Sequence, residues 1–344
     1  MIPTKAYAAM KACDELKPWS FNRRELGRND VLIDIKYCGI CHSDLHQVKD
    51  EWSNGIFPMV PGHEIVGVVK SVGSKVNKFK VNDRVGVGCM VNSCGDCIYC
   101  VAGDEQFCVD GASFTYNSTE FGEPTYGGYS TQIVVNENFV LQIPDNLNLE
   151  AAAPLLCAGI TTYSPLKQHK AGHGKHVAVA GLGGLGHMAV KLAKAMGATV
   201  TVLSRGEGKR QSALNLGADN YLSTSDAKTF EAGELFDIMI DTISAPHNFT
   251  AYINLLKLDG VMSLVGAPPE PSLIDTTRLV MRRKSLTGSL IGGIKITQEM
   301  LDFCGKQNIV SDIELIKIDY VNKAYERMLA SDVKYRFVID CSSI

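Results

Sequence analysis

The sequence has no apolar run long enough to cross a membrane, because Gly, Lys or Asp interrupts every run well before about 20 residues. The stretch from Met1 to Cys13 mixes charged and apolar residues and lacks the apolar centre of a signal peptide. No lipidation or retention signal is visible at the other end. A formal net charge of −3 gives no electrostatic reason to expect a nucleic-acid partner. These absences exclude membrane and nucleic-acid partners and leave the cytoplasm as the expected location.

Internal repeats and low-complexity linkers are also absent, and 344 residues exceed one ordinary core, so two domains are expected. The first third of the chain contains short strand-like stretches at residues 31–37, 64–70 and 84–88. Gly, Asn and Asp separate these stretches at short intervals, which is typical of a small β-barrel.

From about residue 158, strand-like stretches alternate with helical ones. Residues 176–180 read as a buried strand, 184–196 as a helix and 199–203 as the next strand. This alternation predicts a doubly wound parallel sheet. The end of the chain reads as helix then strand and is expected to return to the first domain. The sequence therefore predicts an α/β protein with a β-barrel domain at 1–157 and 296–344 and a doubly wound domain at 158–295.

A glycine-rich turn, Gly181-Leu-Gly-Gly-Leu-Gly186, joins the strand at 176–180 to the following helix and matches G-x-G-x-x-G. Gly181 permits the tight turn, Gly183 lets the backbone approach a pyrophosphate, and Gly186 lets helix and strand pack closely. Gly184 and Leu185 complete the turn at a helix N-terminus, whose free N–H groups would face the phosphates. The flanking strand and helix favour a dinucleotide site over a glycine-rich turn that binds nothing.

The next strand lacks the terminal Asp or Glu that usually binds the ribose 2′-hydroxyl of NAD. It ends at Ser204, and Arg205, Lys209 and Arg210 follow. A hydroxyl and three cations suit a 2′-phosphate, so the expected cofactor is NADP(H). Glu207 interrupts the cations and counts against this reading, and the alternative is the solvated start of a helix.

The 11 cysteines include four close together, Cys94, Cys97, Cys100 and Cys108. Clustered cysteines in a reducing compartment indicate metal rather than disulfides, and a disulfide pair in this loop is the alternative. Four thiolates form a closed tetrahedral zinc site with no open position for substrate. The loop is therefore expected to hold a structural zinc ion.

A second set of metal-binding residue types is scattered along the chain. It comprises Cys41 and His46 in one motif, His63 and Glu64 in Pro-Gly-His-Glu, and a distant Cys157. Two thiolates and one imidazole form an open catalytic zinc arrangement, with water or substrate as the fourth ligand. Spacing alone does not bring these residues together, and each reads equally as a buried cysteine or a satisfied histidine.

These motifs occur in the same order as in zinc-containing medium-chain alcohol dehydrogenases, which the chain resembles nearly end to end. The stretches 153–166 and 288–293 are similar to the cinnamyl alcohol dehydrogenase branch. The resemblance implies a GroES-like catalytic domain, a Rossmann NADP-binding domain and a homodimer. It also implies two Zn²⁺ per chain, one of them structural and the other catalytic.

The resemblance further implies roles for individual residues. Cys41, His63 and Cys157 would bind the catalytic zinc, with Glu64 as an alternative ligand and Asp44 orienting the zinc-bound histidine. Ser43 would hydrogen-bond the substrate oxygen, and a proton relay would continue through the nicotinamide ribose to His46. Cys38 and His42 receive no role. The remaining candidates are Ser289 and Ile291 at the cofactor and Gln47, Trp52, Phe57, Cys89, Phe114, Leu290 and again Ile291 at the substrate.

The implied activity is zinc-dependent reversible reduction of aldehydes to primary alcohols with NADPH. An apolar pocket suits aromatic substrates such as cinnamaldehyde or benzaldehyde, or medium-chain aliphatic aldehydes. One alternative is an NAD-dependent polyol or secondary alcohol dehydrogenase of the same superfamily. Another is a non-catalytic zinc scaffold, against which the slightly acidic charge and the retained ligand motifs argue.

Overall fold

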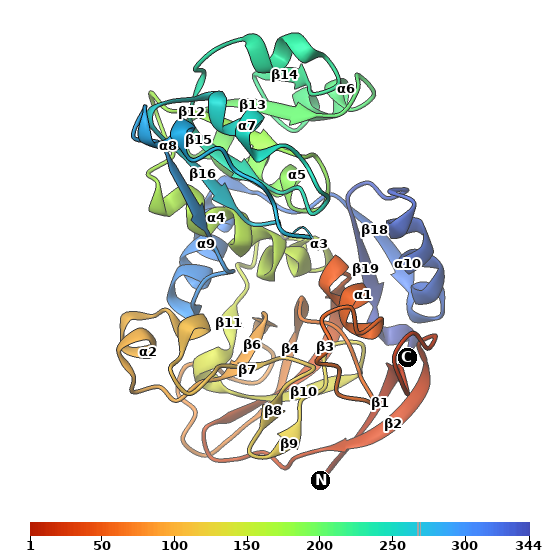
Figure 1. Cartoon of the computed structure of the whole chain (residues 1–344). Coiled ribbons are helices and arrows are strands. Elements are labelled where there is room, and N and C mark those ends of the chain that lie inside the picture. The colour runs from red at the N-terminus through yellow and green to blue at the C-terminus, as the bar shows by residue number, and fades with distance from the viewer. Residues whose placement is uncertain (267, 269) are drawn as a thin grey trace. The chain divides into compact units, whose positions relative to one another are not determined.

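The computed structural model describes residues 1–266, 268 and 270–344. The chain divides into two compact units, Met1–Cys157 with Gly292–Ile344 in the first and Ala158–Ile291 in the second (Figure 1). The return to the first unit comes after Ile291, whereas the sequence suggested a boundary between residues 295 and 296. Within the described residues, no helix combines the length and apolar character needed to cross a membrane.

The first unit is built on a seven-stranded sheet with the order β11-β5-β4-β3-β19-β18, in which β10 also pairs with β3. Its strands are β3 (Asp30–Gly39), β4 (Ile65–Val72), β5 (Arg84–Val87), β10 (Gln132–Asn136), β11 (Leu141–Gln142), β18 (Ile313–Lys317) and β19 (Arg336–Asp340). The central strand β3 runs antiparallel to β4, β10 and β19. Its apolar side chains Val31, Ile33 and Ile35 are buried in the core.

Three two-stranded ribbons complete the β-structure of this unit. They pair β1 (Ile2–Ala8) with β2 (Lys17–Arg23), β6 (Met90–Asn92) with β7 (Ser113–Phe114), and β8 (Thr119–Glu120) with β9 (Glu123–Pro124). The α-helices are α1 (His42–Val48), α2 (Ile98–Ala102), α3 (Leu149–Ala152), α9 (Ile294–Gln307) and α10 (Val321–Leu329). The 3₁₀ turns are η1 (Glu105–Phe107), η2 (Glu137–Phe139), η3 (Ala153–Leu156), η5 (Ile318–Tyr320) and η6 (Cys341–Ser343).

The second unit is a six-stranded parallel sheet with the order β14-β13-β12-β15-β16-β17. The strands are β12 (His176–Ala180), β13 (Thr199–Ser204), β14 (Asn220–Ser223), β15 (Phe236–Asp241), β16 (Leu256–Leu264) and β17 (Ser285–Gly288). The helical segments are α4 (Ala158–Gln168), α5 (Gly186–Ala195), α6 (Arg210–Asn215), η4 (Ala227–Glu231), α7 (Phe249–Asn254) and α8 (Thr277–Val280). The predicted doubly wound parallel sheet is confirmed.

Strand order in this sheet reverses between β12 and β15. In doubly wound folds, ligands bind at such a switch point, outside the carboxyl ends of the strands. The glycine-rich turn follows β12, and a second loop follows β15, so both lie at that edge. The fold therefore brings the predicted dinucleotide motif to the position where a nucleotide would bind.

Candidate active site

Four residues from three parts of the first unit meet at one buried site. One potential ligand atom from each of Cys41, His63, Glu64 and Cys157 lies within 4.8 Å of the others. Cys41 caps α1, His63 and Glu64 immediately precede β4, and Cys157 follows η3. The Sγ atoms of Cys41 and Cys157 are 3.9 Å apart although 116 positions separate the two residues.

Asp44 is wholly buried and ties the parts of this site together. Its carboxylate accepts hydrogen bonds from Cys41 N at 2.8 Å and Gly62 N at 3.1 Å. The same carboxylate accepts from the Tyr129 hydroxyl at 3.1 Å and faces His63 Nδ1 at 3.1 Å. A histidine that donates from Nδ1 has Nε2 free to bind a metal ion. The contacts of Asp44 therefore fit the orienting role expected for it.

Glu64 forms a buried ion pair with Arg336, which begins β19. Arg336 donates to Glu64 Oε1, while Glu64 Oε2 is buried without a hydrogen-bond partner. Burial raises the pKa of Glu64, and the Arg336 charge acts in the opposite direction. An unpartnered carboxylate oxygen beside two thiols and an imidazole is a suitable further metal ligand.

The thiols of this site perturb each other strongly. Their hydrogen bond lowers the pKa of Cys41 and raises that of Cys157. A hydrogen bond with Cys157 also lowers the pKa of Cys89, which lies partly buried nearby. Binding of a divalent cation displaces the protons of buried thiols that hydrogen-bond to one another. This set of thiol and imidazole ligands therefore fits zinc.

Ser43 and His46 lie on α1 beside the cluster. The Ser43 hydroxyl is 3.7 Å from Cys41 Sγ. His46 Nδ1 is 2.5 Å from Glu51 Oε2, and its side chain is one-third exposed, at 33%. Trp52 packs against the His46 ring with centroids 5.5 Å apart. Glu51 was not named from the sequence, because an acid in a polar loop gives no signal of contact with a histidine five residues away.

The proposed substrate residues are distributed over both units. In the first unit, Gln47 accepts a hydrogen bond from Asn117, Trp52 and Phe114 are exposed, and Cys89 lies near Cys157. Phe57, another substrate candidate, belongs to this unit as well. Ser289, Leu290 and Ile291 follow β17 in the second unit, where Ser289 N donates to Leu264 O at 3.0 Å. Their roles toward substrate or cofactor stay predictions.

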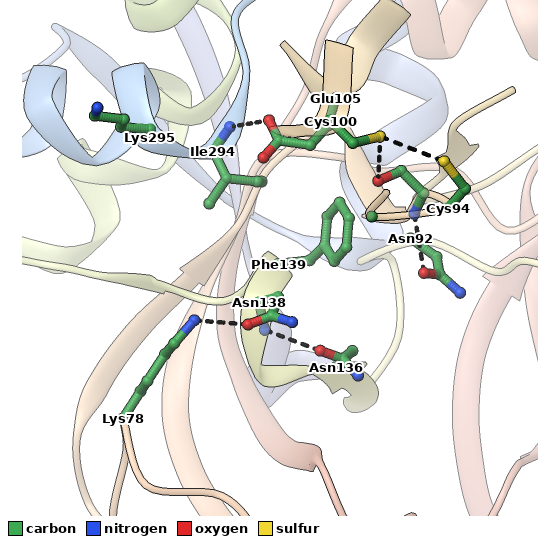
Figure 2. A pocket seen from close by; sticks show the side chains of 12 residues that line it. Lys78, Asn92, Cys94, Cys100, Glu105, Asn136, Asn138, Phe139, Ile294 and Lys295 are labelled. Atoms are coloured by element: carbon green, nitrogen blue, oxygen red, sulfur yellow. Dashed lines mark hydrogen bonds between the residues drawn. The ribbon is translucent and has the colours of Figure 1, made fainter. Parts of the chain in front are cut away.

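The four-cysteine loop surrounds α2, where ligand atoms of Cys94, Cys97, Cys100 and Cys108 lie within 4.8 Å of one another. Backbone amides of Cys94 and Cys97 donate to Cys108 Sγ and Cys94 Sγ, both at 3.4 Å. Figure 2 shows Cys100 Sγ beside Cys94 Sγ at 3.8 Å, on the border of a pocket of about 500 Å³. Four sulfurs that face one another form a closed site, which suits a structural ion.

A pocket of about 520 Å³ lies at the switch point of the second unit. The glycine-rich turn contributes Gly181, Leu182 and Gly183 to it. The end of β13 and the segment after it contribute Ser204, Arg205 and Lys209. Nothing lies within 4 Å of a Cβ built on Gly183, so the backbone there is open to a ligand. Lys209 Nζ donates to Leu182 O at 2.8 Å and so links the two halves of the pocket.

Gly181 and Gly186 make close contacts within the fold. Gly181 has φ +90°, and a Cβ there would lie 2.7 Å from Thr242 Oγ1. A Cβ on Gly186 would lie 2.2 Å from Gly181 O, which confirms the close strand-to-helix contact predicted for it. Gly184 and Leu185 do not line the pocket, and Leu185 caps α5 without a side-chain hydrogen bond. No side chain therefore caps the start of α5, although the amide of His187, its second residue, donates to Gly183 O at 3.0 Å.

Two family descriptions match the chain. Residues 27–145 match "Alcohol dehydrogenase GroES-like domain", and residues 184–306 match "Zinc-binding dehydrogenase". NADP-dependent alcohol dehydrogenase C 1 of Mycolicibacterium smegmatis is 56% identical, covering 100% of this chain and 99% of that protein. Aldehyde reductase YahK of Escherichia coli is 54% identical, covering 98% and 97%. The chain belongs to the zinc-binding alcohol dehydrogenase family.

Within this dehydrogenase family, the chain falls in the cinnamyl alcohol dehydrogenase branch. The crystal structure of the Helicobacter pylori cinnamyl alcohol dehydrogenase, complexed with NADP(H), superimposes with a TM-score of 0.93 at 46% identity. That match covers 99% of each chain. The fold class predicted from the sequence, a GroES-like domain with a Rossmann domain, is therefore confirmed.

The two candidate zinc clusters of this dehydrogenase differ in their ligand sets. The four-cysteine cluster is closed, whereas the Cys41 cluster combines two thiols, an imidazole and an unpartnered carboxylate oxygen. Sequence reasoning missed Tyr129 and Arg336. Tyr129 donates a hydrogen bond to Asp44 beside the cluster, and Arg336 donates one to Glu64. The only sequence signal for Arg336 is a lone cation at the start of an apolar strand.

Proposed function

We propose that the protein reduces aldehydes reversibly to primary alcohols with NADPH and a catalytic zinc ion. The observation that carries this proposal is the buried Cys41–His63–Cys157 cluster with an unpartnered Glu64 oxygen beside it. Similarity to an aldehyde reductase and to an NADP-dependent alcohol dehydrogenase supports the reaction class and the cofactor.

Cys41, His63 and Cys157 would hold the zinc ion through two sulfurs and one ring nitrogen. When bound, zinc supplies a Lewis acid that polarises the substrate carbonyl, and NADPH supplies the hydride. Asp44 keeps the His63 ring in the tautomer that presents Nε2. Glu64 remains close enough to serve as an alternative ligand.

Two residues of α1 would take part in proton transfer to the substrate oxygen. The Ser43 hydroxyl lies beside the cluster and would donate a hydrogen bond to the substrate oxygen. His46 is partly exposed and would exchange the proton with solvent. Glu51 accepts a hydrogen bond from His46 Nδ1 and so fixes the orientation of that ring.

In the second unit, Gly181, Gly183 and the start of α5 would bind the pyrophosphate. Ser204, Arg205 and Lys209 would bind the 2′-phosphate of NADPH, because a hydroxyl and two cations border the same pocket. Gly184, Leu185, Ser289 and Ile291 complete the proposed cofactor contacts. Strand β13 ends in Ser204 rather than in an acid, which disfavours NAD.

The proposed substrates are aromatic or medium-chain aldehydes, such as cinnamaldehyde or benzaldehyde. Gln47, Trp52, Cys89, Phe114 and Leu290 are the proposed contacts, and apolar and aromatic side chains dominate this set. A single polar amide, that of Gln47, would orient the substrate.

We also propose a homodimer in the cytoplasm. Strand β17 pairs with β16 alone among the described strands, and Val280 and Met281 close to it in the chain are exposed. An outer strand flanked by exposed apolar residues suits pairing with a second copy. All eleven cysteines are free of disulfides, which suits a reducing compartment.

Reduction of cinnamaldehyde by purified protein with NADPH and with NADH, before and after zinc chelation, tests the proposal. Turnover that prefers NADPH and disappears on chelation, then returns with added zinc, supports it. Preference for NADH would contradict the 2′-phosphate assignment and favour a polyol or secondary alcohol dehydrogenase. Absence of turnover with aromatic and aliphatic aldehydes alike would favour a non-catalytic scaffold.

A further inference from the structure

His247 lies between β15 and α7 with both ring nitrogens facing oxygen acceptors. Its Nε2 is 3.1 Å from Asp241 Oδ2, and its Nδ1 is 2.9 Å from the Ala245 carbonyl. A neutral imidazole donates from one nitrogen only and would leave the other lone pair against an oxygen. The imidazolium donates from both nitrogens, so this geometry favours the protonated ring.

The ion pair is shielded from solvent. Side-chain exposure is 10% for His247 and 1% for Asp241. The ring stacks on Phe249, with centroids 4.3 Å apart and an interplanar angle of 26°, and meets the edge of Tyr252 at 5.3 Å. A shielded, charge-assisted hydrogen bond is stronger than one at the surface, so the position of the ring is well defined.

Asp241 ends β15 and anchors the loop that forms one wall of the 520 Å³ pocket. Its Oδ1 accepts from Ile243 N at 3.0 Å, while Oδ2 faces His247. Thr242 donates to Ala180 O from its amide at 2.9 Å and from its hydroxyl at 2.8 Å. These bonds tie the wall at residues 242–248 to the strand that precedes the glycine-rich turn.

The same pocket is bordered on its polar side by Ser204, Arg205 and Lys209. In the proposed function, these residues bind the 2′-phosphate of NADPH. Because the wall at 242–248 borders the same pocket, it faces the adenosine end of the cofactor. Resting on that function, we propose that His247, as an imidazolium paired with Asp241, is a positioning residue for the adenosine end of the cofactor. It acts by fixing the wall against which the nucleoside packs.

The acid and the carbonyl that face the ring support a protonated state, whereas the cations that border the same pocket oppose it. Asp241 faces it from β15 and Tyr252 from α7, while Arg205 and Lys209 border the pocket from the segment after β13. Burial lowers the pKa of His247, but the hydrogen bonds to Asp241 and the Ala245 carbonyl outweigh burial and raise the pKa above 6.5. The pair therefore stabilises the fold fully below pH 6.5 and loses that contribution as pH rises through the raised pKa.

Calorimetric titration of zinc-loaded wild type and His247→Gln with NADPH and with adenosine 2′,5′-bisphosphate tests this inference. Glutamine retains a neutral donor but removes the charge. The variant is expected to raise both Kd values about tenfold, or about 1.4 kcal/mol. The kcat at saturating NADPH and the KM for aldehyde stay at wild-type values. His173→Gln, which changes an exposed histidine of the same unit outside this pocket, keeps the wild-type Kd.

A second measurement uses the wild type alone, in case the variant fails to fold. Nitrogen-15 NMR of histidine-labelled protein is expected to show a titration midpoint for His247 above the ordinary histidine value of about 6.5. A wild type that binds neither NADPH nor the bisphosphate contradicts the proposed function. Normal binding with unchanged affinities in folded His247→Gln, or a His247 midpoint at or below about 6.5, overturns the inference while leaving the proposed function intact.

Discussion

Replacing Tyr129 with phenylalanine tests whether the hydrogen bonds behind His63 stabilise the metal site. Tyr129 is 0% exposed, and its hydroxyl donates to Asp44 at 3.1 Å. Removing one hydrogen bond to a buried carboxylate costs about 1.5–3 kcal/mol. At roughly 2–4 °C per kcal/mol for a domain of this size, the melting temperature should fall by about 3–12 °C.

Tyr325→Phe provides a matched control. The Tyr325 hydroxyl is also buried but donates to the Tyr129 hydroxyl at 3.4 Å, a long bond between neutral groups. Its loss should cost about 0.5 kcal/mol, at the low end for neutral hydrogen bonds. The two variants remove the same atom from neighbouring tyrosines, so their difference isolates the contact with Asp44.

Zinc affinity distinguishes a role of Tyr129 in positioning His63 from a role in the stability of the fold alone. Tyr129→Phe should weaken zinc binding at the Cys41 site about three- to tenfold in competition with a chelator, less than the 10–100-fold typical for a direct partner of a ligand. The visible spectrum of the cobalt-substituted protein should also change in Tyr129→Phe. Equal effects of Tyr129→Phe and Tyr325→Phe on melting and on metal affinity would refute the reasoning.

Two further experiments test the other charged groups. Arg336→Met should destabilise the metal-free protein by about 3–5 kcal/mol in urea unfolding, because it leaves Glu64 buried without its partner. Adding Glu64→Gln should recover more than half of that loss, and simple additivity would contradict the ion-pair argument. Lys209→Met should raise the Kd of NADPH about tenfold while changing that of NADH little, since only NADPH carries the 2′-phosphate. Lys228→Met, outside the pocket, should change neither affinity, and an equal effect of Lys209→Met on both cofactors would contradict a 2′-phosphate contact.

The fold was predictable because its elements have local signals. The strand predicted at 84–88 is observed at Arg84–Val87, and the one at 199–203 extends to Ser204. The helix predicted at 184–196 begins only at Gly186, because Gly183 and Gly184 belong to the turn. Glycine-rich turns and continuous apolar strands are encoded by adjacent residues, so the sequence alone defines them to within a few positions.

The metal site was predictable only in part. The four-cysteine loop is encoded by local spacing, but Cys157 reaches Cys41 across 116 positions through the packing of η3. Arg336 reaches Glu64 across 272 positions, through the pairing of β19 with β3. Neither contact has a local signal, because it depends on which strands become neighbours. The family resemblance named Cys157, whereas Arg336 emerged only from the folded chain.

The charges of the buried site explain why a divalent cation belongs there. Glu64 and Arg336 cancel one another, and Asp44 is directed at His63 and at backbone amides. Two thiolates alone would add two buried negative charges, which low-dielectric surroundings strongly disfavour. A divalent cation with two thiolates adds no net charge, and it also gives the unpartnered Glu64 oxygen a positive neighbour. Zinc binding and folding of the first unit should therefore be coupled, and removal of zinc should lower the free energy of unfolding of this unit.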